Sequence, residues 1–84
     1  MELKMTTLRA LKFEEKSGKD LIDFLKQVGD TGKISVKDIV LLFEACGDGY
    51  TVEMFDQWDA NFTEKVTAIM EAVKVFIGAD DAKN

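Results

Sequence analysis

The sequence predicts an all-α fold, a small single-domain bundle of about five short helices. Three observations support this prediction. The chain contains no proline, apolar residues recur at helical spacing in successive segments, and five of the six glycines lie between these segments or directly after one. At 84 residues the chain is long enough for one domain, so we treat 1–84 as a single helical domain with frayed ends at 1–5 and 79–84. The alternation in "MELKM" also allows a short N-terminal strand.

Capping residues and apolar stripes define the first two helices. The first is expected to begin near Thr6 or Thr7 and to end within "EEKSGK". Its apolar positions are Leu8, Leu11 and Phe13. In the second helix, Ser17 and Asp20 have the spacing of a capping box, and Gly29 is placed to end the helix. Its apolar stripe consists of Leu21, Ile22, Phe24, Leu25 and Val28.

The third helix is predicted to be apolar on nearly every side. Ser35 and Asp38 again have capping-box spacing, and Gly47 and Gly49 follow the helix. Its apolar positions are Val36, Ile39, Val40, Leu41, Leu42, Phe43, Ala45 and Cys46. A helix of this kind should lie at the centre of the bundle or be covered by a partner.

Two further helices complete the predicted bundle. Thr51 can cap a short fourth helix that ends near residue 59. Its apolar positions are Val52, Met54, Phe55 and Trp58. Asn61 and Glu64 have capping-box spacing before a fifth helix at about 63–78. The main stripe of this helix is Val66, Ile69, Met70, Val73, Phe76 and Ile77.

Composition and charge argue against several kinds of chemistry. The net charge is −5 and the chain has no His, the residue most often used as a general base and metal ligand. An acidic protein does not suit nucleic acid, whose phosphates attract clustered Lys and Arg. Cys46 is the single cysteine and lies in an apolar run, so we interpret it as a buried core residue. No apolar run has the length of a signal peptide or a membrane span, and we expect a cytoplasmic protein without membrane contact.

The stretch "QVGDTGKISVKDIVLLFEA" can be compared with an EF-hand calcium loop. Gly32 and Ile34 would then occupy loop positions 6 and 8. The side-chain ligand positions would fall on Gln27, Gly29, Thr31, Ser35 and Asp38. Only Asp38 among them carries a carboxylate, whereas a calcium loop depends on several and ends on a bidentate Glu. We therefore interpret the stretch as a capped turn between two helices and expect no metal and no other cofactor.

The sequence contains no recognisable catalytic motif. P-loop, GxSxG and GxGxxG patterns are missing, and acidic residues near helix starts have a structural use. A paired-carboxylate hydrolase is an alternative that requires a concave cluster of carboxylates with perturbed pKa values. The segment "VKDIVLLFEAC" has one Lys among many apolar residues, which does not suit a DNA recognition helix. We expect neither enzymatic activity nor a nucleic-acid partner.

Two groups of residues are candidates for partner binding. Aromatic and Met residues near the fourth helix are typical of contact patches. This group consists of Tyr50, Met54, Trp58 and Phe62. Small residues on the fifth helix form a second seam opposite its main stripe, and this seam consists of Ala68, Ala72, Val75 and Ala79. A structural interpretation stays open for both, because Trp58 can be a core anchor and Ala is common on exposed helix surfaces.

The order of three segments carries a resemblance to a known family. They are "TLRALKFEEKSGKDLIDFL", "ISVKDIVLLFEACGDGYTVEMFDQW" and "TEKVTAIMEAVKVFIGAD". Over about residues 6–79, the chain resembles the tail assembly chaperones of long, non-contractile-tailed bacteriophages and their prophage relatives. The family shares an order of helices and some apolar and glycine positions, without a catalytic signature, so it assigns no role to any single residue.

The resemblance implies a non-enzymatic role in virion assembly. Chaperones of this family bind the tape measure protein, keep it from aggregating and help recruit tail tube subunits. They act in the host cell cytoplasm and are absent from the mature virion. Self-association is compatible with this role. The alternative from the residues alone is a degenerate EF-hand-like helical module that binds another protein without metal.

Overall fold

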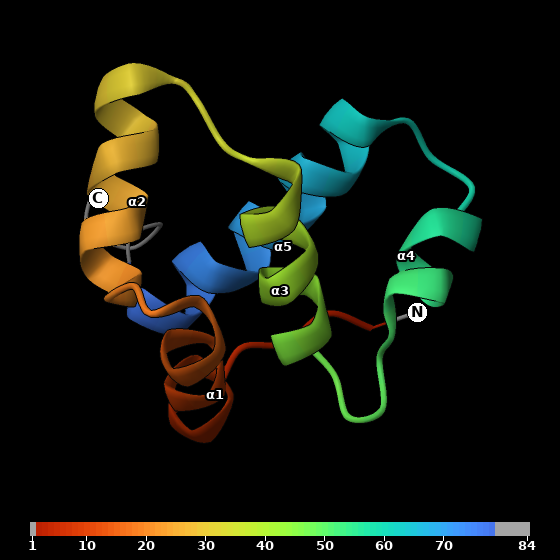
Figure 1. The fold of residues 1–84 in the computed structure, drawn as a ribbon, viewed down its shortest axis with the longest axis horizontal. Helices are drawn as coiled ribbons and strands as arrows, with labels where there is room; N and C mark the ends of the chain where they lie inside the picture. The colour runs from red at the N-terminus through yellow and green to blue at the C-terminus, as the bar shows by residue number, and fades with distance from the viewer. Residues whose placement is uncertain (1, 79–84) are drawn as a thin grey trace.

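The computed structural model describes residues 2–78, which form five α-helices and no strand (Figure 1). The helices are α1 (Thr7–Ser17), α2 (Leu21–Thr31), α3 (Val36–Ala45), α4 (Val52–Gln57) and α5 (Phe62–Ile77). The predicted all-α bundle is confirmed. The short N-terminal strand does not form within the described residues, and the expected frayed end at 79–84 lies outside them.

Helix α3 lies at the centre of the bundle, where it contacts α1, α4 and α5 (Figure 1). Its residues Ile39, Leu42 and Phe43 are fully buried, as is Cys46 directly after it. This placement confirms that Cys46 is a core residue and explains why α3 is apolar on nearly every side. Val36 in the first turn is the most exposed of its apolar residues, at 62%.

Helix α1 packs against α3 with a different side from the one predicted. Ala10 and Phe13 are buried, whereas Leu8 and Leu11 are more than half exposed. Ala10 and Phe13 both belong to the core cluster, and Phe13 contacts Phe24 of α2 with ring centroids 5.5 Å apart. The prediction was wrong for the two leucines, because three apolar positions make too thin a stripe to fix which side of a helix turns inward.

Helix α2 begins and ends later than predicted. Its N-cap is Asp20, whose carboxylate accepts a hydrogen bond from the Asp23 N–H, while Ser17 is the last residue of α1. Gly29 lies inside the helix, and Gly32 ends it with a φ of 69°. Gly29 follows the last apolar position of the stripe, but Gly32 supplies the left-handed conformation that commonly ends a helix.

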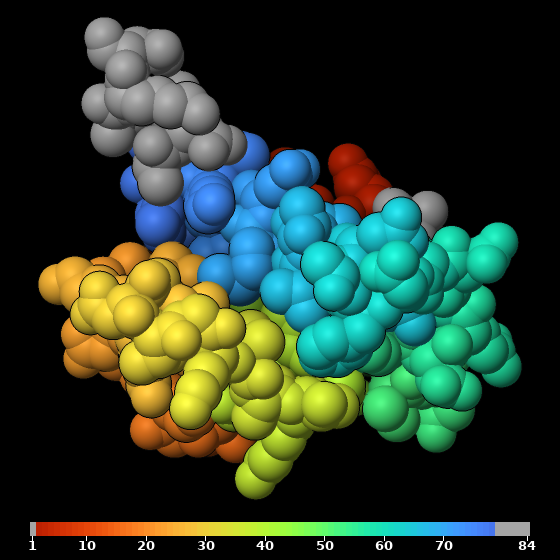
Figure 2. All heavy atoms as spheres, turned by 90° about the horizontal axis from the view of Figure 1, so that it is seen from above, coloured from red at the N-terminus to blue at the C-terminus, as the bar shows by residue number. Residues whose placement is uncertain are grey.

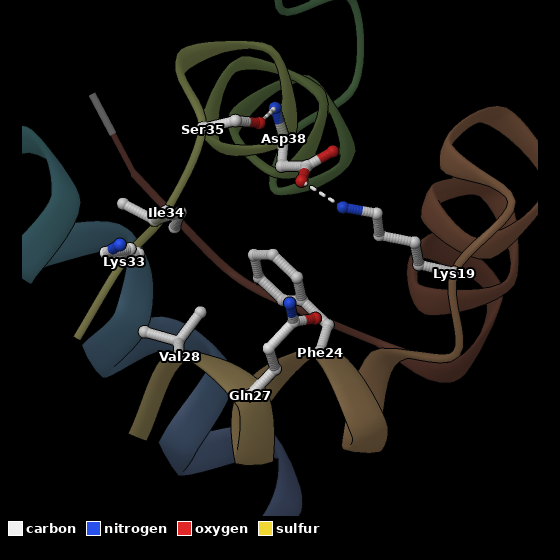
Figure 3. Close-up of a pocket in the computed structure, with 8 residues that line it drawn as sticks. All are labelled: Lys19, Phe24, Gln27, Val28, Lys33, Ile34, Ser35 and Asp38. Carbon is white, nitrogen blue, oxygen red and sulfur yellow. Dashed lines mark hydrogen bonds and ion pairs between the residues drawn. The ribbon is translucent and has the colours of Figure 1, made fainter. Parts of the chain in front are cut away.

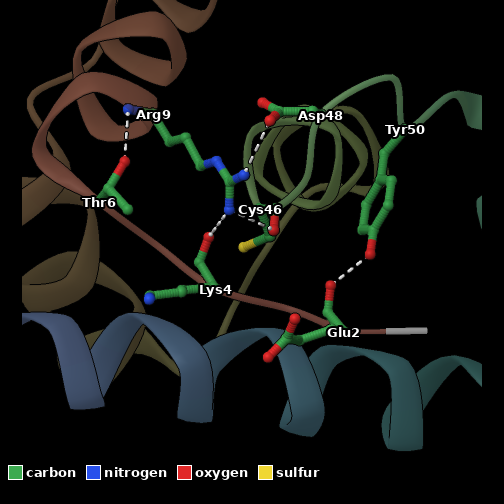
Figure 4. A network of polar contacts seen from close by, with 7 residues as sticks. All are labelled: Glu2, Lys4, Thr6, Arg9, Cys46, Asp48 and Tyr50. Carbon is green, nitrogen blue, oxygen red and sulfur yellow. Dashed lines mark hydrogen bonds and ion pairs between the residues drawn. The ribbon is translucent and has the colours of Figure 1, made fainter.

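The N-terminal segment is packed against the helices, contrary to the expectation that 1–5 is frayed. Met5 is only 4% exposed, and the Lys4 N–H donates to the Cys46 carbonyl at 2.9 Å. The Arg9 guanidinium donates to the carbonyl oxygens of Lys4 and Cys46, at 2.8 and 3.3 Å (Figure 4). A buried methionine and these backbone contacts therefore hold residues 2–5 beside the end of α3.

Side-chain caps begin the last two helices as predicted. The Thr51 hydroxyl accepts a hydrogen bond from the Met54 N–H at the start of α4. Asn61 and Glu64 form a capping box at the start of α5, in which each side chain accepts from the other residue's N–H at 2.8 and 2.9 Å. Gly78 ends α5 with a φ of 78°. The fully buried positions of α5 are Ile69 and Val73, both within the predicted stripe.

Candidate functional site

The turn between α2 and α3 places Asp38 against a lysine (Figure 3). The Asp38 side chain is 9% exposed, and its Oδ2 lies 2.5 Å from Lys19 Nζ. The Asp38 N–H donates to Ser35 Oγ at 3.1 Å, so Ser35 is the N-cap of α3, as its spacing predicted. Within residues 2–78, no three Asp, Glu, Cys or His side chains are grouped as metal ligands. Asp38 therefore joins the start of α3 to the segment before α2.

The ion pair also determines the protonation state of Asp38. Burial raises the pKa of this carboxyl, but Lys19 and Ser35 lower it by more, so the net pKa lies below the ordinary value of 3.8. A carboxylate of this kind is ionised at neutral pH and cannot serve as a general acid there. Asp38 is the one buried carboxylate of the described residues, so its close partner is the amine of Lys19 and not a second buried acid.

Cys46 is buried next to the contacts of Arg9 (Figure 4). Burial raises the pKa of the Cys46 thiol to about 11, although the nearby charge of Arg9 acts in the opposite direction. A thiol that is protonated at neutral pH and shielded from solvent is not suited to nucleophilic catalysis. Arg9 also lies 3.3 Å from the Asp48 carboxylate, so it connects α1 to the N-terminal segment and to the loop after α3.

Most of the first predicted partner-binding group extends the core. The rings of Tyr50 and Trp58 stack on the buried Phe43, with centroids 5.1 and 5.8 Å from it. Met54 is half-buried and packs against the core as well. Phe62 is the exception, at 41% exposed, and would be the main contact that this group offers to a partner. The structure thus assigns Trp58 the anchoring role that the sequence left open.

Contacts on both sides hold Tyr50 in place. Its hydroxyl donates to the Glu2 carbonyl (Figure 4). Its ring also fills the space next to Gly47, where an added Cβ would lie 2.3 Å from ring atoms. Gly47 is therefore required for the position of Tyr50, whose role in the isolated chain is structural.

The small-residue seam on α5 does not form one continuous exposed surface. Ala72 packs against the core and Ala68 is half-buried, whereas Val75 is 70% exposed. Ala79, the last member of the seam, lies outside the described residues. Of the seam, Val75 is thus the residue most available to another molecule.

An apolar groove between α2 and α5 was not predicted from the sequence. The C-terminal half of α5 lies beside α2 (Figures 1 and 2), yet no Cα atom of one helix comes within 8 Å of the other. The space between them is a cavity of about 490 Å³. Its lining consists of Ile22, Leu25, Lys26, Val28, Gly29, Met70, Lys74 and Ile77. We call this cavity the α2–α5 groove.

The sequence signal for the groove depends on the correct end of α2. Interpreting Gly29 as a helix end removes it from the helical surface. Once α2 continues to Thr31, Ile22, Lys26 and Gly29 follow one another at spacings of four and three and share one face. The distance between α2 and α5 depends on how the helices pack, so it cannot be predicted from the spacing of residues within α2.

No family model, curated protein or solved structure matches the chain. The helices of the described residues include none that is long and apolar enough to cross a membrane. The fold and the surface together define a small all-α domain with an open apolar groove.

Proposed function

We propose that this chain is a non-enzymatic chaperone of phage tail assembly, which binds the tape measure protein and helps recruit tail tube subunits. The observation that carries the proposal is the amount of large apolar side chain left exposed on so small a domain. Within residues 2–78 these side chains are Leu8, Leu11, Ile22, Val36, Val52, Phe62, Val75 and Ile77. Such side chains are typical of protein contact surfaces where they gather in one patch, as Ile22 and Ile77 do at the α2–α5 groove.

Charge and chemistry support the same proposal. The net charge of −5 favours repulsion between chaperone molecules and helps keep their complexes in solution. The buried Asp38 is paired with Lys19, and the Cys46 thiol is protonated and shielded, so neither group is available for catalysis. A protein that coats a long helical partner needs adhesive surface and no reactive group.

Co-expression with a phage tape measure protein tests the proposal. We expect the long protein to move into the soluble fraction and to co-purify with this chain, and we expect tail tube subunits to bind the complex. If the solubility of the tape measure protein is unchanged and no complex is recovered, the proposal is wrong. Mass spectrometry of purified virions provides a second check, because the chain should be present in infected cytoplasm and absent from the particle.

Two exposed residues allow the contact surface to be tested in the same assay. Phe62→Ser and Val75→Ser each remove apolar surface that is exposed in the isolated chain. We expect both variants to recover less tape measure protein. Val75→Ser should keep the melting temperature of the parent, whereas Phe62→Ser should lower it somewhat, because the Phe62 ring also packs edge-on against Phe55 at a centroid distance of 6.3 Å. Lys12→Ser is a matched control, because it changes an exposed residue of α1 without removing a large apolar group.

A degenerate EF-hand-like module that binds another protein without metal is the alternative. Its support is the helix–turn–helix arrangement of α2 and α3, in which Asp38 is already paired with Lys19. Calorimetry with calcium is expected to give no binding heat. Micromolar binding that disappears in Asp38→Ala would instead favour a metal-dependent module and count against both proposals.

A further inference from the structure

We propose that the α2–α5 groove binds one amphipathic helix of a partner protein, and that this helix carries acidic residues beside its apolar face. The inference deepens the proposed function, on which it rests, by naming the surface and the chemistry of the helix that it takes. Three features of the groove carry it: its apolar walls, its two lysines and its glycine.

The walls of the groove are apolar and incompletely covered. Ile22 on α2 and Ile77 on α5 are 44% and 38% exposed, and Met70 is half-buried between the helices. Helices that pack directly have axes about 8–10 Å apart, and because their Cα atoms lie about 2.3 Å from each axis, facing Cα atoms come well within 8 Å of one another. No Cα atoms of α2 and α5 come that close. A third helix laid between them would bury both isoleucines, which is the helix-in-groove mode of recognition.

The charged residues of the groove are both basic. Lys26 and Lys74 line it from opposite helices, in a protein whose net charge is −5. Acidic residues beside the apolar stripe of a partner helix would pair with these two amines. A second copy of the chain is a poorer occupant, because two-fold symmetry would bring four lysines into one interface.

Gly29 supplies the third feature. It lies inside α2, where glycine makes the helix less stable than alanine would. A Cβ added at this position would meet nothing within 4 Å. The residue therefore leaves open space in the wall of the groove at a cost to the helix. This space would allow the backbone of a bound helix to approach α2 closely.

Two synthetic peptides test the proposal by fluorescence anisotropy on the full chain. Both are amphipathic helices of about 18 residues, or five turns, with the same leucine stripe. One carries Glu beside the stripe and the other carries Lys. We expect the Glu peptide to bind about tenfold more tightly, which corresponds to about 1.4 kcal/mol from two partly exposed charge pairs.

Substitutions in the groove determine where the peptide binds. Lys26→Glu combined with Lys74→Glu should reverse the preference between the two peptides. Gly29→Leu should weaken both peptides at least about tenfold by filling the groove, and its melting temperature should not fall, because leucine forms helices better than glycine. Gly29→Ala is the matched control, since it stabilises the same helix while adding a single methyl group.

Three results would overturn the inference. The first is failure of the Glu peptide to bind the parent. The second is equal affinity of the parent and Gly29→Leu for the peptides. The third is a dimer of the parent that Gly29→Leu dissociates, which would make a second copy of the chain the occupant of the groove. The same variants in the tape measure co-expression separate this inference from the proposed function. If the parent and Gly29→Leu recover the long protein equally, the function stands and the groove assignment is wrong, whereas no recovery by the parent removes the function itself.

Discussion

Lys65 is a buried amine that joins two helices. Its side chain is on α5 and only 8% of the residue is exposed, yet its ammonium group donates to the Phe55 carbonyl of α4 at 2.7 Å. The same nitrogen lies 4.7 Å from the centre of the Phe55 ring. Because carbonyl groups at a helix C-terminus carry partial negative charge, Lys65 satisfies and stabilises the end of α4.

Replacing this amine should lower stability. Lys65→Met keeps an unbranched apolar side chain and removes the charged donor, so we expect a loss of about 1–2 kcal/mol in the free energy of unfolding. Urea denaturation followed by circular dichroism measures the difference. Lys12→Met, at an exposed site on α1, should stay within about 0.5 kcal/mol of the parent. Equal stability of the two variants would mean that the hydrogen bond of Lys65 contributes nothing measurable.

Asp38 makes stability depend on acidity in a defined direction. Its pKa in the folded protein lies below 3.8, because Lys19 and Ser35 together outweigh the effect of burial. On acidification the unfolded chain therefore takes up its proton first. The stabilisation from this group is complete above the ordinary pKa of Asp and is lost as the pH falls through the lower folded value.

Carboxyl NMR titration of Asp38 checks this prediction directly. We expect the parent to titrate below pH 3.8, and we expect Lys19→Met to raise the pKa, because the carboxylate would stay buried without its cation. Lys12→Met is again the control and should leave the titration of Asp38 unchanged. A pKa that does not respond to Lys19→Met would contradict the ion pair.

At the level of the helices, the sequence predicts those helix starts that are determined by local hydrogen bonds. Ser35, Thr51 and Asn61 cap the helices that their spacing assigned to them, since a cap depends on residues only three positions away. The start of α2 is different because two residues could cap it. Ser17 has a possible capping partner three positions later in Asp20, and Asp20 has one three positions later in Asp23. Asp20 prevails, and Ser17 Oγ instead accepts a hydrogen bond from the Lys19 N–H.

Two substitutions at helix positions should change stability in opposite directions. Asn61→Ala removes the capping box of α5 and should cost about 0.5–2 kcal/mol. Gly29→Ala should add about 0.5–1 kcal/mol, because it replaces a glycine inside α2 at a position with open space. Thermal denaturation of both proteins against the parent measures the effects. A loss of stability in Gly29→Ala would show that the glycine conformation, rather than the groove, requires this residue.

At the scale of the whole molecule, packing decides which residues become surface. Leu8 and Leu11 were expected inside and are exposed, while Tyr50 and Trp58 were candidates for the surface and stack on Phe43. Apolar character does not separate the two pairs. The difference arises because α1 turns Ala10 and Phe13 into the core instead of its leucines. The loop after α3 and the end of α4 bring the rings of Tyr50 and Trp58 onto one buried phenylalanine. The candidate surface was therefore predicted in part, and the α2–α5 groove was not.

The same packing should let α2 open alone more easily than α3. Among the described helices its backbone lies close only to α1, whereas α3 contacts α1, α4 and α5. Amides of α2 should therefore exchange with solvent through local opening at a free energy at least about 1 kcal/mol below that of α3. Native-state hydrogen exchange measured by NMR resolves the two helices.

Binding at the groove should change this exchange pattern. A peptide held between α2 and α5 would add the contacts that α2 lacks, so it should slow exchange in α2 and in the C-terminal half of α5. Amides of α3 that exchange only by global unfolding should gain no more than the overall stabilisation by the peptide. Gly29→Ala without peptide should slow exchange in α2, and in α3 only by the overall gain in the free energy of unfolding. If α2 and α3 exchange at one common free energy in the parent, the bundle unfolds as a single unit, and the groove is held open by a rigid α2 instead of a mobile one.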